Sequence, residues 1–189
     1  MLKQTILKFL LFLFLCFYIS DLQAKIINNI AIQIRGTDSL EFNFIQISNG
    51  ITENGSCKLK RPYYLKCEYI SKNQKQLIIN KKKLVIFHKR YNKIYHYPLS
   101  KSFFTEILNK DAFEKIILNG KLKENDENYI VKCILKEKGD IDFYFDKKDL
   151  DLIGWDLISL NSSKLSFKIQ NLKKNEMIDD NYFKIPKVN

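Results

Sequence analysis

Two stretches of alternating side chains, joined at Pro62, are the feature that most constrains the fold of this chain. With a period of two residues, one face of the two stretches carries Cys57, Leu59, Arg61, Leu65, Cys67 and Tyr69. The opposite face carries mostly lysine, serine and glutamate side chains. The pattern predicts a β-hairpin with one buried face and one face in solvent.

Arg61 is in phase with the apolar face of this hairpin. The chain has 32 basic residues, and only three of them are arginines, Arg35, Arg61 and Arg90. A buried guanidinium needs acceptors because an unpaired buried charge is costly, and its planar fork can bond several carbonyl groups at once. The segment alone leaves two interpretations open: an arginine bound to buried carbonyl groups, or an arginine at a strand end that reaches solvent.

The first 24 residues have the pattern of a signal peptide that is cleaved after Ala24. Two lysines precede an uninterrupted apolar run over residues 9–19, which is too short to span a bilayer because a span takes about 20 residues. Cys16 follows a leucine and not a small residue, which argues against a lipid-modified cysteine. We expect residues 25–189 to form an exported, soluble mature protein with a single domain.

The chain has a formal net charge of +11 at pH 7. Its lysines are spread along the sequence and no nucleic-acid-binding motif is present, so we do not expect nucleic acid as a partner. The charge is compatible with a general attraction to anionic membrane surfaces.

The predicted mature chain has three cysteines, Cys57, Cys67 and Cys133. This odd number excludes a complete set of disulfides within the chain. Because Cys57 and Cys67 are equally far from Pro62, a tight hairpin places them opposite each other, and an oxidising compartment would allow a cross-strand disulfide. The alternative is that both remain free thiols and act as small apolar side chains.

The rest of the chain predicts a mainly β protein. Isoleucines at helical spacing predict an amphipathic helix from Ile26 to Ile34, and Asn49-Gly50 and Asn54-Gly55 indicate loops. Leu40, Phe42 and Phe44 share the phase of one further strand, and other strands are expected at residues 56–60, 64–70, 76–80, 84–89, 93–97, 128–136, 140–146, 155–160 and 164–171. Short helices are expected at residues 103–108 and 112–118, with one helical turn at 179–182. The elements predict a single antiparallel sheet that is long enough to curl, with about three helices on one face.

No pattern in the sequence points to catalysis. The two histidines, His88 and His96, are not part of a metal-spaced cluster, and no nucleophile elbow or glycine-rich phosphate loop occurs. Asp140 and Asp142 share a strand face as a catalytic carboxylate pair would, but an ordinary hydrated face explains them better. We therefore predict a binding protein that is not an enzyme and that uses no metal or other cofactor.

Several short motifs follow one another between Leu40 and Pro186. They are Phe44-Ile45-Gln46, residues 55–69, Leu77-Ile78-Ile79, residues 84–87, Tyr97-Pro98-Leu99 followed by residues 103–108, then residues 139–141, 152–156, 171–172 and 183–186. In this order and spacing they resemble the periplasmic outer-membrane lipoprotein carrier proteins, the LolA family. Three departures from the family pattern are Cys67 in place of a large aromatic residue, a turn at residues 80–83 without glycine, and no proline before Phe103.

The resemblance implies a single curved, incompletely closed antiparallel β-barrel with a helical lid over an apolar cavity. Members of the family carry the acyl chains of lipoproteins across the periplasm, from an inner-membrane lipoprotein-releasing ABC transporter to an outer-membrane acceptor. The same function, partners and periplasmic location are therefore implied for this chain, which we expect to be a monomer. Arg61 matches the family arginine that bonds the lid backbone and so holds the empty cavity shut.

On this interpretation, ten side chains are predicted to line the lid and the apolar side of the sheet: Ile34, Leu59, Leu65, Cys67, Tyr69, Ile107, Leu108, Phe143, Phe145 and Trp155. Ordinary core packing is the alternative for each of them. Two other functions stay open from the sequence. One is an exported protein of the same fold that binds or senses a different lipid, and the other is a small exported enzyme that depends on a thiol.

Overall fold

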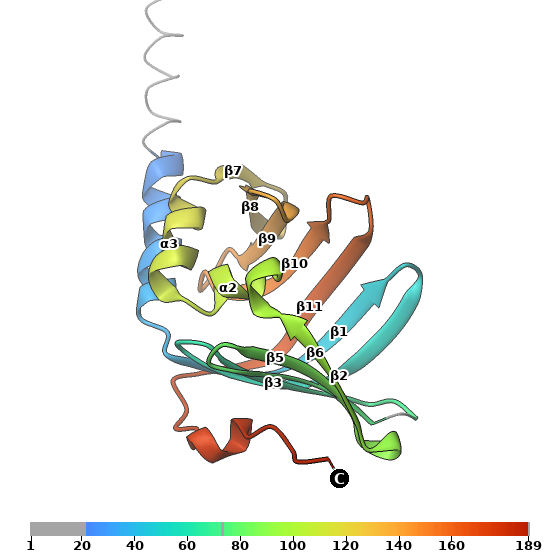
Figure 1. Cartoon of the computed structure of the whole chain (residues 1–189). Coiled ribbons are helices and arrows are strands. Elements are labelled where there is room, and N and C mark those ends of the chain that lie inside the picture. Colours follow the sequence, from blue (N-terminus) through green and yellow to red (C-terminus); the bar gives the residue numbers. More distant parts are fainter. Residues whose placement is uncertain (1–21, 73, 189) are drawn as a thin grey trace, which may run out of the picture.

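The computed structural model describes residues 22–72 and 74–188, and its main element is one antiparallel sheet of eleven strands (Figure 1). The strands lie in the order β6-β5-β4-β3-β2-β1-β11-β10-β9-β8-β7. Their bounds are β1 Ser39–Ser48, β2 Ile51–Lys60, β3 Tyr64–Tyr69, β4 Lys75–Asn80, β5 Lys83–His88, β6 Lys93–Pro98, β7 Lys121–Glu124, β8 Asn128–Leu135, β9 Gly139–Asp146, β10 Leu152–Ile158 and β11 Lys164–Lys174. The pairing of β1 with β11 joins a first arm, β1–β6, to a second arm, β7–β11.

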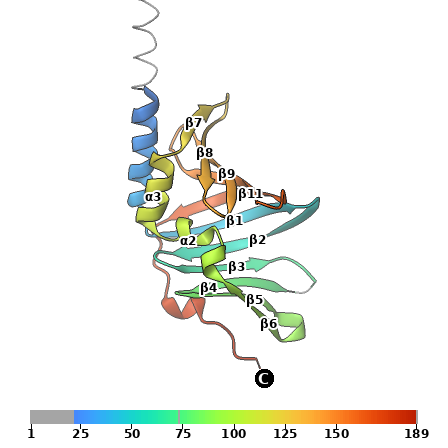
Figure 2. The same ribbon diagram turned by 45° about the horizontal axis from the view of Figure 1, so that its top comes forward.

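The sheet is curved and does not close. The two arms bend toward each other, with the short helix α2 (Phe104–Ile107) between them (Figures 1 and 2). Among the described strands, β6 and β7 stand at the two edges and are not paired with each other. The prediction of a curved, incompletely closed antiparallel sheet is therefore confirmed.

The longer helices pack on the inward side of the second arm. A helix over residues 22–35 runs beside α3 (Lys110–Leu118), and an ion pair between Arg35 and Glu114 joins the two (Figure 1). The side chain of Asn109 caps α3 by accepting a hydrogen bond from the backbone N–H of Ala112 at 2.9 Å. Phe113 of α3 is buried against a phenylalanine of β9. These two helices therefore fill one end of the hollow that the sheet forms.

The N-terminal part of the predicted signal peptide, residues 1–21, lies outside the described residues. Residues 22–24, which precede the predicted cleavage site, are exposed. Their removal would therefore take away no buried side chain. Within the described part of the chain, no helix has both the length and the apolar character needed to cross a membrane.

The C-terminal segment crosses the outer face of the first arm. It contains the 3-10 helix η3 (Asp180–Phe183), close to the predicted helical turn. Phe183 is fully buried there, with its ring centroid 5.3 Å from that of Tyr64. Lys60 donates hydrogen bonds to the backbone oxygen of Ile178 at 3.0 Å and to Asp180 at 2.6 Å. These contacts fix the C-terminal segment on the outside of the sheet, away from the hollow.

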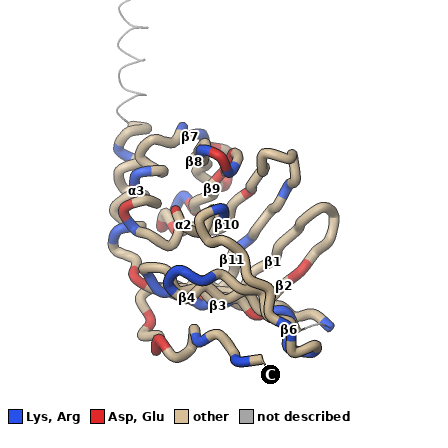
Figure 3. The backbone as a smooth tube through the Cα atoms, viewed as in Figure 1, with Lys and Arg blue, Asp and Glu red and all other residues tan. Residues whose placement is uncertain are grey.

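Basic residues are found on both arms and on the helices (Figure 3). The three consecutive lysines Lys81, Lys82 and Lys83 form the most continuous basic stretch, at the turn between β4 and β5. The distribution agrees with the scattered lysines of the sequence.

One of the two predicted loops lies inside a strand. Asn49-Gly50 does form the turn between β1 and β2, where both residues have positive φ angles of 48° and 80°. Asn54-Gly55 instead lies in the middle of β2, so the loop prediction is wrong there. A Cβ atom on Gly55 would lie 2.9 Å from the ring of Phe44 and would press on the carbonyl oxygen of Glu68 in β3. Glycine is present because two neighbours approach the strand too closely for a side chain.

We expect Gly55→Ala to lower the free energy of unfolding by about 2 kcal/mol, because the new methyl group forces the backbones of β2 and β3 apart. Chemical denaturation of the two proteins measures the difference. Gly36→Ala is the control, since a Cβ at Gly36 meets only ordinary van der Waals contacts. Equal stability of the Gly55→Ala variant and the unmodified protein would contradict this account of Gly55.

Candidate functional site

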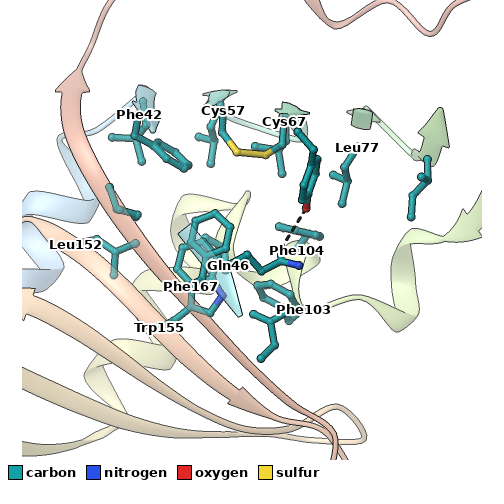
Figure 4. A pocket seen from close by; sticks show the side chains of 18 of the residues that line it. Phe42, Gln46, Cys57, Cys67, Leu77, Phe103, Phe104, Leu152, Trp155 and Phe167 are labelled. Carbon is teal, nitrogen blue, oxygen red and sulfur yellow. Dashed lines mark hydrogen bonds between the residues drawn. A yellow bond between two sulfur atoms is a disulfide. The ribbon is translucent and has the colours of Figure 1, made fainter. Parts of the chain in front are cut away.

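A cavity of about 240 Å³ lies between the two arms of the sheet and the chain that links them (Figure 4). Most of its lining side chains are aliphatic or aromatic. They come from β1 to β5 on one side, from β10 and β11 on the other, and from Phe103, Phe104 and Ile107. We call residues 99–108, which include the 3-10 helix η2 (Leu99–Lys101) and α2, the lid segment.

The first arm supplies a row of side chains that are in register across four strands: Phe42, Cys57, Cys67 and Leu77. Figure 4 shows these four residues in line along one side of the cavity. Cys57 and Cys67 are directly opposite each other, with their Cα atoms 4.1 Å apart, and they form a disulfide in this structure. The remaining described cysteine, Cys133, is a free thiol, and burial raises its pKa to about 12.

The second arm supplies an aromatic wall. Trp155 of β10 stacks on Phe167 of β11, with ring centroids 4.2 Å apart and an angle of 6° between the planes. Phe167 stacks in turn on Phe44 of β1, at 4.9 Å. Phe103 of the lid segment lies edge-on to Trp155 at 6.0 Å. These aromatic contacts form a continuous apolar surface from the sheet to the lid segment.

Arg61 follows the last residue of β2 and is only 9% exposed. Its Nη1 donates hydrogen bonds to the carbonyl oxygens of Ile34 at 3.0 Å and Thr37 at 2.8 Å, and its Nε donates to that of Ile107 at 3.3 Å. Burial lowers the pKa of Arg61 to about 10, which leaves the guanidinium cationic at neutral pH. The arginine is thus bonded to buried carbonyl groups and does not reach solvent. It links β2 both to the end of the helix over residues 22–35 and to α2.

The lid segment is also fastened to the second arm. Lys138, in the turn between β8 and β9, donates hydrogen bonds to the carbonyl oxygen of Ser102 at 3.0 Å and to Thr105 Oγ1 at 2.6 Å. It also forms an ion pair with Glu106 at 2.6 Å, in which both side chains are mostly buried. The lid segment is therefore tied to one arm through Arg61 and to the other through Lys138.

A small polar group lies at one end of the cavity. The hydroxyl group of Tyr69 donates a hydrogen bond to Gln46 Oε1 at 3.1 Å. Lys75 Nζ is 3.9 Å above the centre of the Tyr69 ring and donates to Glu53 at 2.6 Å. Burial raises the pKa of the Tyr69 hydroxyl, so it remains protonated at neutral pH. Gln46, Tyr69 and Lys75 all contribute to the lining, and each has a partner.

Six of the ten side chains predicted for the cavity lie on its lining, together with Arg61: Leu59, Leu65, Cys67, Tyr69, Ile107 and Trp155. The other four are buried but are not among the lining residues: Ile34, Leu108, Phe143 and Phe145. The helices explain this difference. Phe113 of α3 packs against Phe143 with ring centroids 5.0 Å apart, so that part of the inward face of the sheet is already covered.

Sequence reasoning missed several lining residues and the role of Lys138. Phe42 is in phase with Leu40 and Phe44, and Phe167 alternates with Ser166 and Lys168, so both could be placed on an inward face. Phe103 and Phe104 fall within the helix predicted over residues 103–108. Lys138 gives no signal, because it is one lysine in a polar turn of a lysine-rich chain. Within residues 22–72 and 74–188, no three His, Cys, Asp or Glu side chains are arranged to hold a metal ion.

Residues 35–186 match the sequence model of the family described as outer membrane lipoprotein carrier protein LolA. The chain belongs to this family. The match confirms the resemblance seen in the order of the short motifs. The family is a class of carrier proteins and not of enzymes. None of the curated proteins matches the chain significantly.

Solved structures of low sequence identity share the fold. An uncharacterized conserved protein from Thermus thermophilus has a TM-score of 0.53 and 8% identity, over 86% of this chain and 93% of that one. A DUF1329 family protein from Desulfovibrio piger has a TM-score of 0.50 and 10% identity, over 86% and 97%. The structure of the MucA/MucB complex from Pseudomonas aeruginosa has a TM-score of 0.51 and 9% sequence identity, over 88% of this chain and 62% of that one. At these identities the likeness concerns the fold alone.

Proposed function

We propose that the protein binds the acyl chains of lipoproteins in its apolar cavity and carries them through the periplasm, from the inner to the outer membrane. The observation that carries this proposal is an apolar cavity under a lid segment that one buried arginine holds, in a member of the lipoprotein carrier family. The proposal includes removal of residues 1–24, a monomeric carrier, an inner-membrane ABC transporter as donor and an outer-membrane acceptor.

The physical chemistry of acyl chains supports a lidded cavity. Each CH₂ group exposed to water costs about 0.8 kcal/mol, so a carrier must bury the chains during transit. The cavity of about 240 Å³ is smaller than the roughly 300–1,000 Å³ of pockets that hold small ligands. Acylated cargo therefore requires the lid segment to move away from the arms.

Arg61 fits the role of a latch for this movement. In the closed state it bonds the carbonyl groups of Ile34 and Ile107. These bonds stabilise the closed state, whereas bound cargo stabilises the open state. Loading breaks these bonds, and their restoration helps release. We propose that Arg61 holds the empty carrier in its closed state.

The direct test is native mass spectrometry of the protein purified from its exported fraction, under conditions that preserve non-covalent complexes. We expect one triacylated lipoprotein bound per protein molecule. A free phospholipid or another lipid in its place would keep the cavity as a lipid site but overturn the carrier role.

A cavity variant sharpens this test. Leu77→Glu places a carboxylate on the cavity lining, and we expect it to lower the affinity for acylated lipoprotein by at least about 10-fold, because the charge must be desolvated beside the acyl chains. Ile134→Glu makes a similar change at a side chain that is 85% exposed, and it should bind as the unmodified protein does. Equal binding by the Leu77→Glu variant would contradict this cavity as the acyl site.

A further inference from the structure

One polar group on the cavity lining has no partner. The polar side chains that line the cavity are Gln46, Arg61, Tyr69, Lys75 and Trp155. The first four all take part in hydrogen bonds. Trp155 is only 5% exposed, and its Nε1 is one of two buried side-chain nitrogen or oxygen atoms without a hydrogen-bond partner among the described residues. The second, on His88, does not line the cavity.

The two rings that pack on Trp155 offer no strong acceptor to its Nε1. Its ring contacts are with Phe167, face to face, and Phe103, edge-on. An aromatic ring accepts hydrogen bonds only weakly. A buried water molecule typically has about three polar partners, and the two rings packed on Trp155 supply none of them. A buried N–H group that stays unpaired is destabilising, so the site favours a ligand that brings its own acceptor.

The strand register places this donor at a defined level of the cavity. Trp155 pairs with Phe167, and Phe167 pairs with Gln46, so the three residues form one row across β10, β11 and β1. Gln46 is also the partner of Tyr69. The row that contains Phe42, Cys57, Cys67 and Leu77 has no polar group beyond the disulfide, and it lies apart from Trp155 and Gln46 in Figure 4. The cavity lining thus has two parts at different positions along the strands. The polar level contains Trp155, Gln46 and Tyr69, and the apolar level is the row that contains Phe42 and Leu77.

We propose that Trp155 Nε1–H donates a hydrogen bond to the carbonyl oxygen of an acyl linkage, an ester or an amide, in the bound lipid. The hydrocarbon of the same lipid then lies along the apolar row. This inference rests on the proposed function, because it assumes that the cavity holds a lipid. It adds that the site distinguishes acyl lipids, which have a carbonyl group at this point, from alkyl lipids, which do not.

Two lipids of equal chain length test the assignment: 1-monopalmitoylglycerol, an ester, and 1-O-hexadecylglycerol, the corresponding ether. We expect the unmodified protein to bind the ester about 10-fold more tightly, as the loss of one buried hydrogen bond implies. Trp155→Phe should bind both lipids with equal affinity. Tyr69→Phe removes the hydroxyl group of the same polar level but leaves the Trp155 N–H in place, so it should keep the preference for the ester.

A spectroscopic measurement needs no variant. The chain has a single tryptophan, so an ¹⁵N-labelled sample has one indole N–H signal. We expect this signal to shift downfield on addition of the ester and to move much less with the ether. Equal affinity of the unmodified protein for both lipids, or a preference that persists in Trp155→Phe, would overturn the inference and leave the proposed function standing. Binding of neither lipid would count against the proposed function itself.

Discussion

Replacing Arg61 with leucine is expected to give a protein that binds acylated cargo tightly and releases it slowly. The change removes all three hydrogen bonds from the guanidinium to the carbonyl groups of Ile34, Thr37 and Ile107. Hydrogen bonds to charged groups contribute about 1.5–3 kcal/mol each, so the loss of even one from the closed state would raise the apparent affinity for cargo by about 10- to 150-fold. The fold should persist because the strands and helices keep their own contacts.

The measurement is the rate at which a loaded carrier gives up a triacylated lipoprotein to acceptor membranes. Arg90→Leu is the matched control, since Arg90 lies in the 3-10 helix η1 (Lys89–Tyr91), is exposed, and is not a lining residue of the cavity. We expect the control to release cargo at the normal rate. Normal release by Arg61→Leu as well would show that Arg61 does not act as a latch.

Removal of the disulfide is expected to have the largest effect on stability. In the chain-entropy description, a cross-link between residues separated by 10 positions stabilises the folded state by about 3 kcal/mol. The double variant Cys57→Ala/Cys67→Ala should therefore melt about 6–12 °C below the unmodified protein, given the size of this domain. Differential scanning calorimetry with and without a reducing agent measures both states.

The reducing agent supplies the control for this experiment. It should lower the melting temperature of the unmodified protein and of Cys133→Ala, and it should leave the double variant unchanged. Alkylation of the denatured protein before reduction should modify Cys133 and neither Cys57 nor Cys67. Modification of Cys57 and Cys67 without reduction would mean that the two cysteines are free thiols in the purified protein.

Alternation of side chains was enough to predict most strands and the inward direction of Arg61. It could not show which inward side chains line the cavity, because that depends on where the helices lie. Phe143 and Trp155 are both inward residues of neighbouring strands, yet Phe143 is covered by Phe113 and Trp155 lines the cavity. Ile107 and Leu108 are adjacent in sequence, and the turn of the helix directs only Ile107 to the cavity.

Other features depended on contacts between distant residues. The pair Asn54-Gly55 is typical of a turn. Gly55 lies in a strand because the ring of Phe44 and the backbone of β3 approach it too closely for a side chain. Strand β7 has only four residues and follows α3 directly, so its pattern is too short to predict. Lys138 contacts residues more than 30 positions away, and no local signal distinguishes it from other lysines.

The gap between the edge strands has a mechanical consequence. The chain passes from β6 to β7 through residues 99–120, which contain the lid segment and α3. In a closed barrel, a larger interior would require a row of backbone hydrogen bonds to break, whereas here the arms can spread by a change of twist alone. Any such spreading pulls on the lid segment, which Arg61 and Lys138 tie to opposite arms. We therefore expect the width of the hollow and the position of the lid segment to change together.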